Sequence, residues 1–342
     1  MKPEAVREAE RVPHGGDDDP AVVDFSANVN PRTPPGVREV FETSLDAATR
    51  YPDDGYPEYR GAAADYVDCA PERVVPTPGG LAGIRLAVKT RVEAGDSVLA
   101  PYPSFGEYAR EVDLQGATPE FVPHDELLDV DPEGHTMAVV CNPNNPTGEA
   151  YDTEELRAFA ARCRDAGTEL LVDEAFLGFT DRPSLAGEEG VVVARSLTKL
   201  FGLPGIRAGF LVATGERLAD LQTARRAWNL GTPAVRVGAH AMGQSEFVDE
   251  TRERVANERA RLHEVLGEEF DVSPSDAPFL LLDANPSERG VDAILATARE
   301  RGVAIRDART FRGLDSHVRV AVRTPEENDR LLAALGVDDV RD

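Results

Sequence analysis

The chain has 342 residues, 41% of them hydrophobic, and a formal net charge of -25 at pH 7. That length and composition suit one large or two medium globular domains with a sizeable core. The negative charge argues against nucleic acid as a partner, because phosphate binding requires positive charge, and no segment approaches the roughly 18 apolar residues of a membrane span.

Lysine is rare in this chain, since only three of its 37 basic residues are lysines. An acidic surface with arginine in place of lysine is typical of a high-salt cytoplasm, and a GC-rich genome also exchanges lysine for arginine. The three cysteines, Cys69, Cys141 and Cys163, form neither a CxxC pair nor a Cys/His cluster, which predicts reduced thiols and no metal site. With no apolar run behind the N-terminus, we expect a soluble, cytoplasmic protein.

From about residue 58 to residue 213, helical patterns alternate with short runs rich in valine and leucine. This alternation predicts an α/β fold, with a mostly parallel sheet covered by helices on both faces. Functional groups in such sheets lie at the carboxyl ends of the strands. The expected strands are residues 72–76, 97–100, 137–141, 169–173, 191–195 and 207–212.

After about residue 233 the sequence becomes richer in charged, helix-forming residues. We expect helices over residues 246–269, 291–301 and 325–335, and strands over residues 277–282, 303–306 and 318–322. These elements predict a small α+β domain at 236–342, after a large domain at 36–235. The N-terminal segment, 1–35, is expected to pack with the small domain.

Lys199 is the most informative single residue. A chain that uses arginine almost everywhere has kept an amine at this position, and arginine cannot replace lysine in a Schiff base. Ser196, Thr198 and Arg207 surround it with groups that suit a phosphate. An ordinary loop lysine is the alternative, but a loop between two predicted core strands is where functional groups tend to lie. The pattern favours a lysine beside a phosphorylated carbonyl cofactor.

Two other predicted strands also end in polar groups. Asp173 closes a buried strand, and its carboxylate can pair with a protonated ring nitrogen; alone, it would be interpreted as a helix cap or loop acid. Residues 142–148 follow a strand and include Asn145, whose amide can donate to a ring oxygen. A simple Pro/Gly turn is the alternative for that segment.

Two further features could contact the same cofactor. Gly80 and Leu81 open a predicted helix, where backbone N–H groups and the helix dipole can bind a phosphate. Phe105 could lie flat on the cofactor ring, although an aromatic residue at this position could equally belong to the core.

In this order, residues 145–148, Asp173 and the segment from Ser196 to Arg207 resemble fold type I pyridoxal-phosphate enzymes of the aminotransferase class I/II superfamily. The resemblance covers nearly the whole chain. It implies pyridoxal 5'-phosphate as the cofactor, with Lys199 as the Schiff-base residue and Asp173 at the pyridine nitrogen, both catalytic. It also implies Asn145 at the ring oxygen and Arg207 at the phosphate. The other cofactor-binding candidates are Gly80, Leu81, Phe105, Phe176, Ser196 and Thr198.

The same resemblance implies a homodimer with a shared active site. In this superfamily a tyrosine, matched here by Tyr51, reaches the phosphate in the neighbouring subunit's site. A non-catalytic transcriptional regulator built on this domain is a less favoured alternative, because it needs an attached DNA-binding domain. Neither the N-terminal segment nor the acidic charge supplies one.

Two subfamilies that act on phosphorylated substrates share this layout: histidinol-phosphate aminotransferases and the threonine-phosphate decarboxylases of cobalamin biosynthesis. Residues 14–16, 24–31 and 305–314 resemble the decarboxylases. Phe176 stands where the aminotransferases generally carry a tyrosine, and Arg323 where they usually have glycine. Asp17 departs from the decarboxylase pattern, which usually has asparagine there.

The resemblance therefore implies decarboxylation of L-threonine O-3-phosphate to (R)-1-aminopropan-2-ol O-2-phosphate, with histidinol-phosphate transamination as the alternative. Arg319 matches the family's carboxylate-binding position, and a second anion is expected near His14. Which arginine binds which anion stays open. The substrate-binding candidates are His14, Gly15, Gly16, Asn28, Arg306, Arg319 and Arg323.

Overall fold

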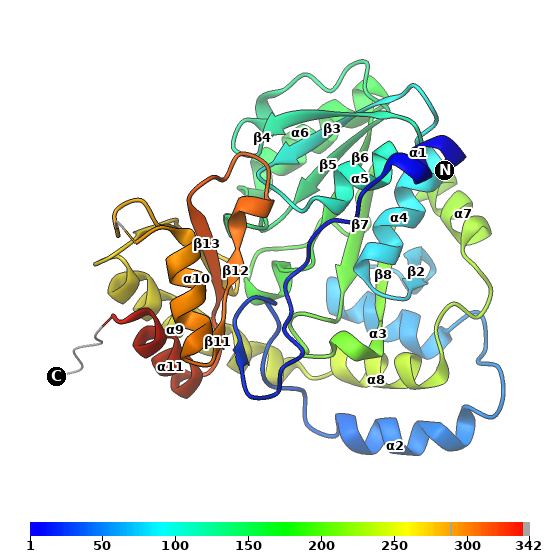
Figure 1. Ribbon diagram of the computed structural model, residues 1–342. Helices are drawn as coiled ribbons and strands as arrows, with labels where there is room; N and C mark the ends of the chain where they lie inside the picture. Colours follow the sequence, from blue (N-terminus) through cyan, green and yellow to red (C-terminus); the bar gives the residue numbers. More distant parts are fainter. Residues whose placement is uncertain (288, 338–342) are drawn as a thin grey trace.

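The computed structural model describes residues 1–287 and 289–337, in which a seven-stranded sheet is flanked by helices and adjoined by a smaller sheet (Figure 1). The predicted α/β fold class is confirmed. Of the described strands in the large sheet, all but β8 run parallel to one another. Its order is β2 (Val74–Thr77), β8 (Gly209–Val212), β7 (Val191–Ser196), β6 (Glu169–Asp173), β5 (Met137–Cys141), β3 (Ser97–Tyr102) and β4 (Thr118–Pro123).

The central strands are continuous apolar runs because both faces of the sheet are buried. Alternate residues of β6 point to opposite sides, so Leu170 and Val172 join one core cluster while Leu171 joins the other. The first cluster includes residues of α3 (Pro57–Val67), α6 (Thr153–Ala166) and α8 (Thr232–Met242) and continues into the C-terminal part of the chain. The second includes residues of α4 (Gly80–Arg91), α5 (Glu107–Asp113) and α7 (Gly215–Ala224). Helix α2 (Val37–Ala47) packs on the outside of α8.

A four-stranded antiparallel sheet forms the second layer of the molecule. Its order is β12 (Arg306–Asp307), β13 (His317–Ala321), β10 (Phe279–Asp283) and β9 (Asp271–Val272), and its helices are α9 (Ser245–Leu266), α10 (Val291–Glu300) and α11 (Pro325–Leu335). Short 3-10 helices complete the described chain: η1 (Pro71–Arg73), η2 (Leu127–Asp129), η3 (Leu177–Phe179), η4 (Pro204–Ile206) and η5 (Ala308–Thr310).

The prediction of one strand over residues 303–306 is wrong. Residues Val303–Ala304 form β11, which pairs in parallel with β1 (Val23–Asp24), whereas β12 pairs with β13. The expected strand is split because the backbone of β11 pairs with the N-terminal segment, where the Phe25 amide donates to the Ala304 carbonyl at 2.7 Å. Residues 303–307 therefore belong to two different sheets.

The N-terminal segment spans the molecule. Helix α1 (Pro3–Glu8) lies beside α5, where the Lys2 amide donates to the Leu114 carbonyl at 2.9 Å, and β1 lies against the C-terminal part of the chain. Residues 9–16, which we call the strap, run between these two anchors (Figure 1). The proposed division at residues 35 and 235 stays a prediction. No helix in residues 1–287 and 289–337 has the length and apolar character to cross a membrane.

Candidate active site

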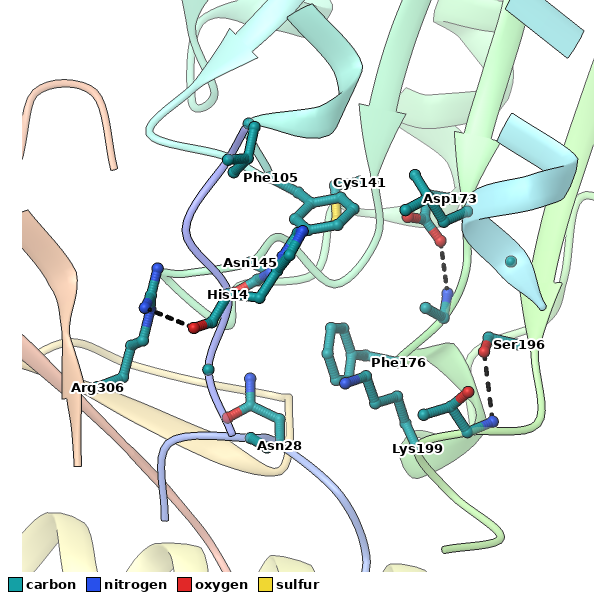
Figure 2. A pocket seen from close by; sticks show the side chains of 18 of the residues that line it. His14, Asn28, Phe105, Cys141, Asn145, Asp173, Phe176, Ser196, Lys199 and Arg306 are labelled. Carbon is teal, nitrogen blue, oxygen red and sulfur yellow. Dashed lines mark hydrogen bonds between the residues drawn. The ribbon is translucent and has the colours of Figure 1, made fainter. Parts of the chain in front are cut away.

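A cavity of about 300 Å³ opens at the carboxyl ends of β5, β6 and β7, where the large sheet faces the strap and the small sheet (Figure 2). It brings together most of the side chains predicted from the sequence. Those that line it are His14, Gly15, Asn28, Gly80, Leu81, Phe105, Asn145, Asp173, Phe176, Ser196, Thr198, Lys199, Arg207, Arg306 and Arg319.

Lys199 follows β7 and points into this cavity, with its Nζ 5.9 Å from the centre of the Phe176 ring (Figure 2). Burial and the positive charges of Arg319 and Arg207 together lower the pKa of this amine to about 8, against the opposing effect of the Asp173 carboxylate. A buried lysine with this pKa is substantially neutral near pH 8, which is the form that acts as a nucleophile.

Asp173 is the last residue of β6 and is buried. Its Oδ2 accepts a hydrogen bond from the Tyr108 hydroxyl at 2.7 Å, and its Oδ1 accepts one from the Ala175 amide at 3.0 Å. Burial raises the pKa of this carboxyl group, and the two donors oppose that rise. Each oxygen keeps a second lone pair, so the carboxylate can accept a further donor from a ligand.

An anion-binding cradle lies at the start of α4. Gly79 has a φ of +95°, and a Cβ there would lie 2.7 Å from an Nη of Arg207, so the guanidinium rests against this glycine. A Cβ on Gly80 would lie 3.1 Å from the Cβ of Ser196. Unpaired N–H groups at a helix start, a guanidinium and a hydroxyl together suit a phosphate.

Arg319 links the small sheet to the site. It lies on β13 and is buried, and its guanidinium donates to Asn145 Oδ1 and to the Ser26 carbonyl, the latter at 2.9 Å. The first bond leaves the NH₂ group of Asn145 available as a donor. Burial and the nearby charge of Arg306 together lower the pKa of Arg319 to about 9. A buried cation with such neighbours favours an anionic ligand.

The strap forms one wall of the cavity and is held by Arg306. The Arg306 guanidinium donates to the carbonyls of His14 at 3.1 Å and Pro13 at 2.8 Å (Figure 2). Gly15 lies so close to the chain after β1 that a Cβ would be 2.2 Å from the Ser26 carbonyl oxygen. The side chain of Asn28 also lines the cavity, and its buried Oδ1 has no hydrogen-bond partner among the described residues. A ligand could supply that partner.

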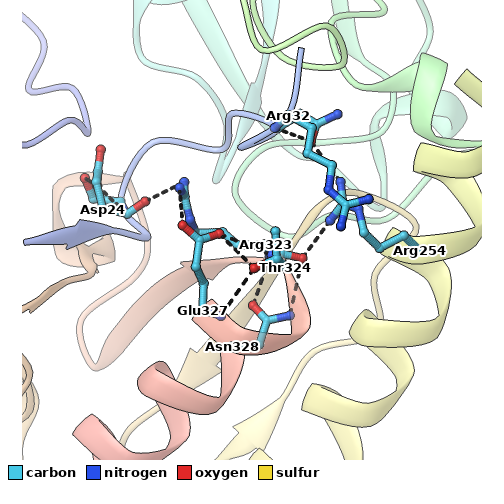
Figure 3. A network of polar contacts seen from close by, with 9 residues as sticks. Asp24, Arg32, Arg254, Arg323, Thr324, Glu327 and Asn328 are labelled. Carbon is cyan, nitrogen blue, oxygen red and sulfur yellow. Dashed lines mark hydrogen bonds and ion pairs between the residues drawn. The ribbon is translucent and has the colours of Figure 1, made fainter. Parts of the chain in front are cut away.

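Three predicted residues do not line the cavity. The amide of Gly16 donates to the hydroxyl of Ser26, a residue that lines the cavity, at 2.7 Å. The guanidinium of Arg323 is engaged elsewhere, by the Asp24 carbonyl at 3.0 Å and Glu327 at 2.9 Å (Figure 3). Tyr51 is 79% exposed and stacks on Trp228. The role of Tyr51 in a neighbouring subunit's site stays a prediction.

Tyr108 and Cys141 also line the cavity, although no sequence motif singled them out. Cys141 ends β5 next to Asp173, and burial raises the pKa of its thiol to about 12, so it stays neutral. Tyr108 lies three residues after Phe105, with 5.5 Å between the two ring centres and the rings nearly perpendicular. A predicted helix start just after Phe105 would have placed Tyr108 in the first turn of that helix, close to Phe105.

The residues present fit pyridoxal phosphate, the cofactor that the resemblance implies. The cradle at Gly79 and Gly80 offers donors for a phosphate, Lys199 offers an amine that is about half neutral near pH 8, and Asp173 offers a buried carboxylate. Phe105 lies on one side of the cavity as an aromatic face. In the described part of the chain no group of three or more acidic, histidine or cysteine side chains is placed to hold a metal ion.

Comparisons with known proteins show the family of this chain. The model of the family "Aminotransferase class I and II" matches residues 20–335. Histidinol-phosphate aminotransferase 2 of Archaeoglobus fulgidus is 32% identical over 93% of each chain. Threonine-phosphate decarboxylase of Salmonella typhimurium is 30% identical over 92% of this chain and 90% of that protein.

The solved structures agree on the fold. That of L-threonine-O-3-phosphate decarboxylase from Porphyromonas gingivalis superposes with a TM-score of 0.81 at 22% identity, over 91% of this chain and 98% of that one. The matches span almost the full length of the relatives as well as of this chain. The protein belongs to the aminotransferase class I and II family.

Proposed function

We propose that this protein is a pyridoxal-phosphate enzyme that decarboxylates L-threonine O-3-phosphate to (R)-1-aminopropan-2-ol O-2-phosphate, a step of cobalamin biosynthesis. The contact between Arg306 and the strap carries the proposal. It joins two of the three stretches that resemble the decarboxylases, residues 14–16 and 305–314, at the wall of one cavity. Two cationic groups, Arg306 and the more deeply buried Arg319, then face a substrate that bears two anions.

Each side chain has a role in this reaction. The bound cofactor would supply an electron sink for the electron pair left at the substrate's alpha carbon. Asp173 would accept a hydrogen bond at the position of the ring nitrogen, and the cradle with Arg207 would hold the phosphate. Arg319 would bind the substrate carboxylate, and Arg306 with His14 the substrate phosphate.

The reaction type depends on how these cations orient the substrate. The bound cofactor would weaken the alpha-carbon bond that the protein aligns with its π system, so the orientation of the substrate would decide which bond breaks. If Arg319 held the carboxylate in that position, carbon dioxide would leave and Lys199 Nζ would deliver a proton to the alpha carbon. If the hydrogen took that position, Lys199 would remove a proton and transamination would follow.

Carbon dioxide release from L-threonine O-3-phosphate, without any keto acid, tests the proposal. We expect one carbon dioxide per aminopropanol phosphate formed, and at least a tenfold loss of kcat/KM in Arg306→Gln because a charge-assisted contact is lost. If the protein instead turns over only histidinol phosphate with 2-oxoglutarate, the decarboxylase proposal fails.

Histidinol-phosphate transamination is the second candidate. The Archaeoglobus relative named for it is 32% identical to this chain, slightly above the 30% of the Salmonella decarboxylase. Both substrates carry a phosphate, so both would use Arg306 and His14. The keto acid requirement separates the two reactions.

A further inference from the structure

Glu107 is a buried charge at the cavity wall with no role in the proposed reaction. It begins α5, two residues after Phe105, and is 6% exposed. Its Oε1 lies 3.1 Å from Nε2 of His14, and its Oε2 accepts from Nη1 of Arg110 at 3.4 Å. A carboxylate at this depth requires partners, and His14 provides one on the cavity side.

This contact determines which nitrogen of His14 faces a ligand. An ionised carboxylate only accepts hydrogen bonds, so Nε2 must carry a hydrogen. Nδ1 makes no hydrogen bond within residues 1–287 and 289–337. The His14 ring lies next to Phe105, 5.7 Å between ring centres, and its side chain lines the cavity (Figure 2). Nδ1 is therefore the ring nitrogen left for a ligand.

The charge of the surroundings indicates the chemistry of that ligand. Arg306 holds the His14 carbonyl, and Arg110 lies on the far side of Glu107. A histidine ring that carries hydrogens on both nitrogens can donate from both, so with Nε2 bound to Glu107 its Nδ1 can donate to a ligand. The position beside Nδ1 and Arg306 then suits an oxyanion.

We propose that Glu107 is a positioning residue that fixes the His14 ring so that Nδ1 donates to the phosphate group of the substrate. This inference rests on the proposed function only in taking a phosphorylated substrate. It predicts that Glu107 contributes to recognition of the phosphate and contributes little to the chemical step.

The chain offers a matched control on the same helix. Glu111 lies one turn after Glu107, is 1% exposed, and pairs with Arg110 at 3.5 Å and Arg85 at 3.4 Å. It does not line the cavity. Both substitutions, Glu107→Gln and Glu111→Gln, therefore replace a buried carboxyl group on α5 that contacts Arg110. Only Glu107→Gln also alters the contact with His14.

We expect Glu107→Gln to raise KM for L-threonine O-3-phosphate about tenfold, with kcat within about twofold of wild type. Glu111→Gln should leave KM unchanged, and His14→Gln should raise it at least as much as Glu107→Gln. In a His14→Gln background, Glu107→Gln should add nothing, because residues that act through one contact are not additive. An equal effect of Glu111→Gln, or a full further increase in the His14→Gln background, overturns the inference.

A binding measurement separates this inference from the proposed function. Inorganic phosphate is titrated into the cofactor-loaded protein and its Kd measured by calorimetry. Weaker phosphate binding in Glu107→Gln, with Glu111→Gln as in wild type, supports the inference even if no carbon dioxide is released from threonine phosphate. Equal phosphate affinity in wild type and Glu107→Gln, or no binding by wild type, overturns it even if decarboxylation is observed.

Discussion

At the scale of single residues, the charge state of Lys199 sets the pH at which the cofactor attaches. The lowered pKa of about 8 leaves the amine neutral above that pH and protonated below it. The rate of covalent attachment to cofactor-free protein should therefore rise with pH through about 8, well below the usual lysine value. The increase in visible absorbance after addition of pyridoxal phosphate measures this rate.

Arg319→Gln should shift the midpoint of this pH dependence to higher pH. The substitution removes the positive charge that, among the charged groups, lowers the Lys199 pKa most. Lys199→Ala provides the control and should bind the cofactor without covalent attachment. A midpoint at the ordinary lysine pKa in wild type, or covalent attachment in Lys199→Ala, would contradict the assignment.

Tyr108 supports Asp173, since its hydroxyl is one of the two donors that oppose the effect of burial on this carboxyl group. Tyr108→Phe removes the donor and keeps the ring, so the pKa of Asp173 should rise further. We expect pyridoxal-phosphate affinity to fall about three- to tenfold, the range for one lost hydrogen bond. Equilibrium dialysis measures it, with Tyr151→Phe as the control because its hydroxyl donates to the His124 carbonyl outside the cavity. Equal losses in both variants would argue against a specific role for Tyr108.

The sequence was sufficient for residues that follow predicted strands, and less so for those that reach the cavity from elsewhere. Lys199, Asp173 and Asn145 were predictable because the carboxyl ends of parallel strands meet at one edge. The partners Tyr108 and Glu107 were not, because a buried tyrosine and a helical glutamate have no distinctive spacing. Arg323 was expected in the cavity but does not line it, for a related reason. The local sequence does not reveal that the Arg323 guanidinium binds the Asp24 carbonyl and the Glu327 carboxylate.

At the scale of elements, the start of α4 carries glycines at positions where neighbouring atoms leave little space for a Cβ. A Cβ on Gly80 would approach Ser196, so Gly80→Ala should displace groups of the phosphate cradle. We expect the Kd for pyridoxal phosphate to rise at least tenfold, since contacts to a phosphate are charge-assisted. Fluorescence titration of the cofactor-free protein measures this.

Gly61→Ala is the matched control for that variant. Gly61 lies in α3, where a Cβ would meet no atom within 4 Å, and alanine favours a helix over glycine by about 0.5–1 kcal/mol. Gly61→Ala should leave the Kd unchanged and slightly raise the thermal midpoint. A comparable loss of cofactor affinity in both variants would show that the effect of Gly80→Ala does not come from the phosphate cradle.

The predicted elements differ in how visible they are in the sequence. Strands β5, β6 and β7 are uninterrupted buried runs, and their expected bounds lie close to the observed ones. Strand β4 was missed because it lies at the edge of the sheet, is half-exposed, and contains Pro119 and Pro123. Prolines are tolerated at an edge but argue against a strand when the edge is not known. The two-residue strands β1 and β11 depend on each other over a separation of 280 residues, which no local pattern reveals.

At the scale of the whole molecule, exposed apolar side chains gather near α2. Phe41 and Leu45 are 40% and 55% exposed on one side of this helix, and Trp228 is 52% exposed beside Tyr51. The resemblance implies a homodimer, and apolar groups of this size suit contact with a second copy. We expect Phe41→Glu with Leu45→Glu to convert dimer to monomer in sedimentation velocity.

Val6→Glu is the corresponding control, because Val6 is 48% exposed on α1, outside this group of residues. It should leave the sedimentation coefficient of the dimer unchanged. If wild type sediments as a monomer at all concentrations, a shared active site with Tyr51 from a neighbour is ruled out.

The stacked pair of Tyr51 and Trp228 has a practical consequence. Trp228 is the one tryptophan in the chain, so indole fluorescence excited selectively comes from a single position. Its ring centre lies 4.6 Å from that of Tyr51, and its side chain is half open to water. Tryptophan emission from this chain therefore reports the local solvation of Trp228. A blue shift of that emission as the protein concentration is raised would indicate, without an added label, that Trp228 becomes buried.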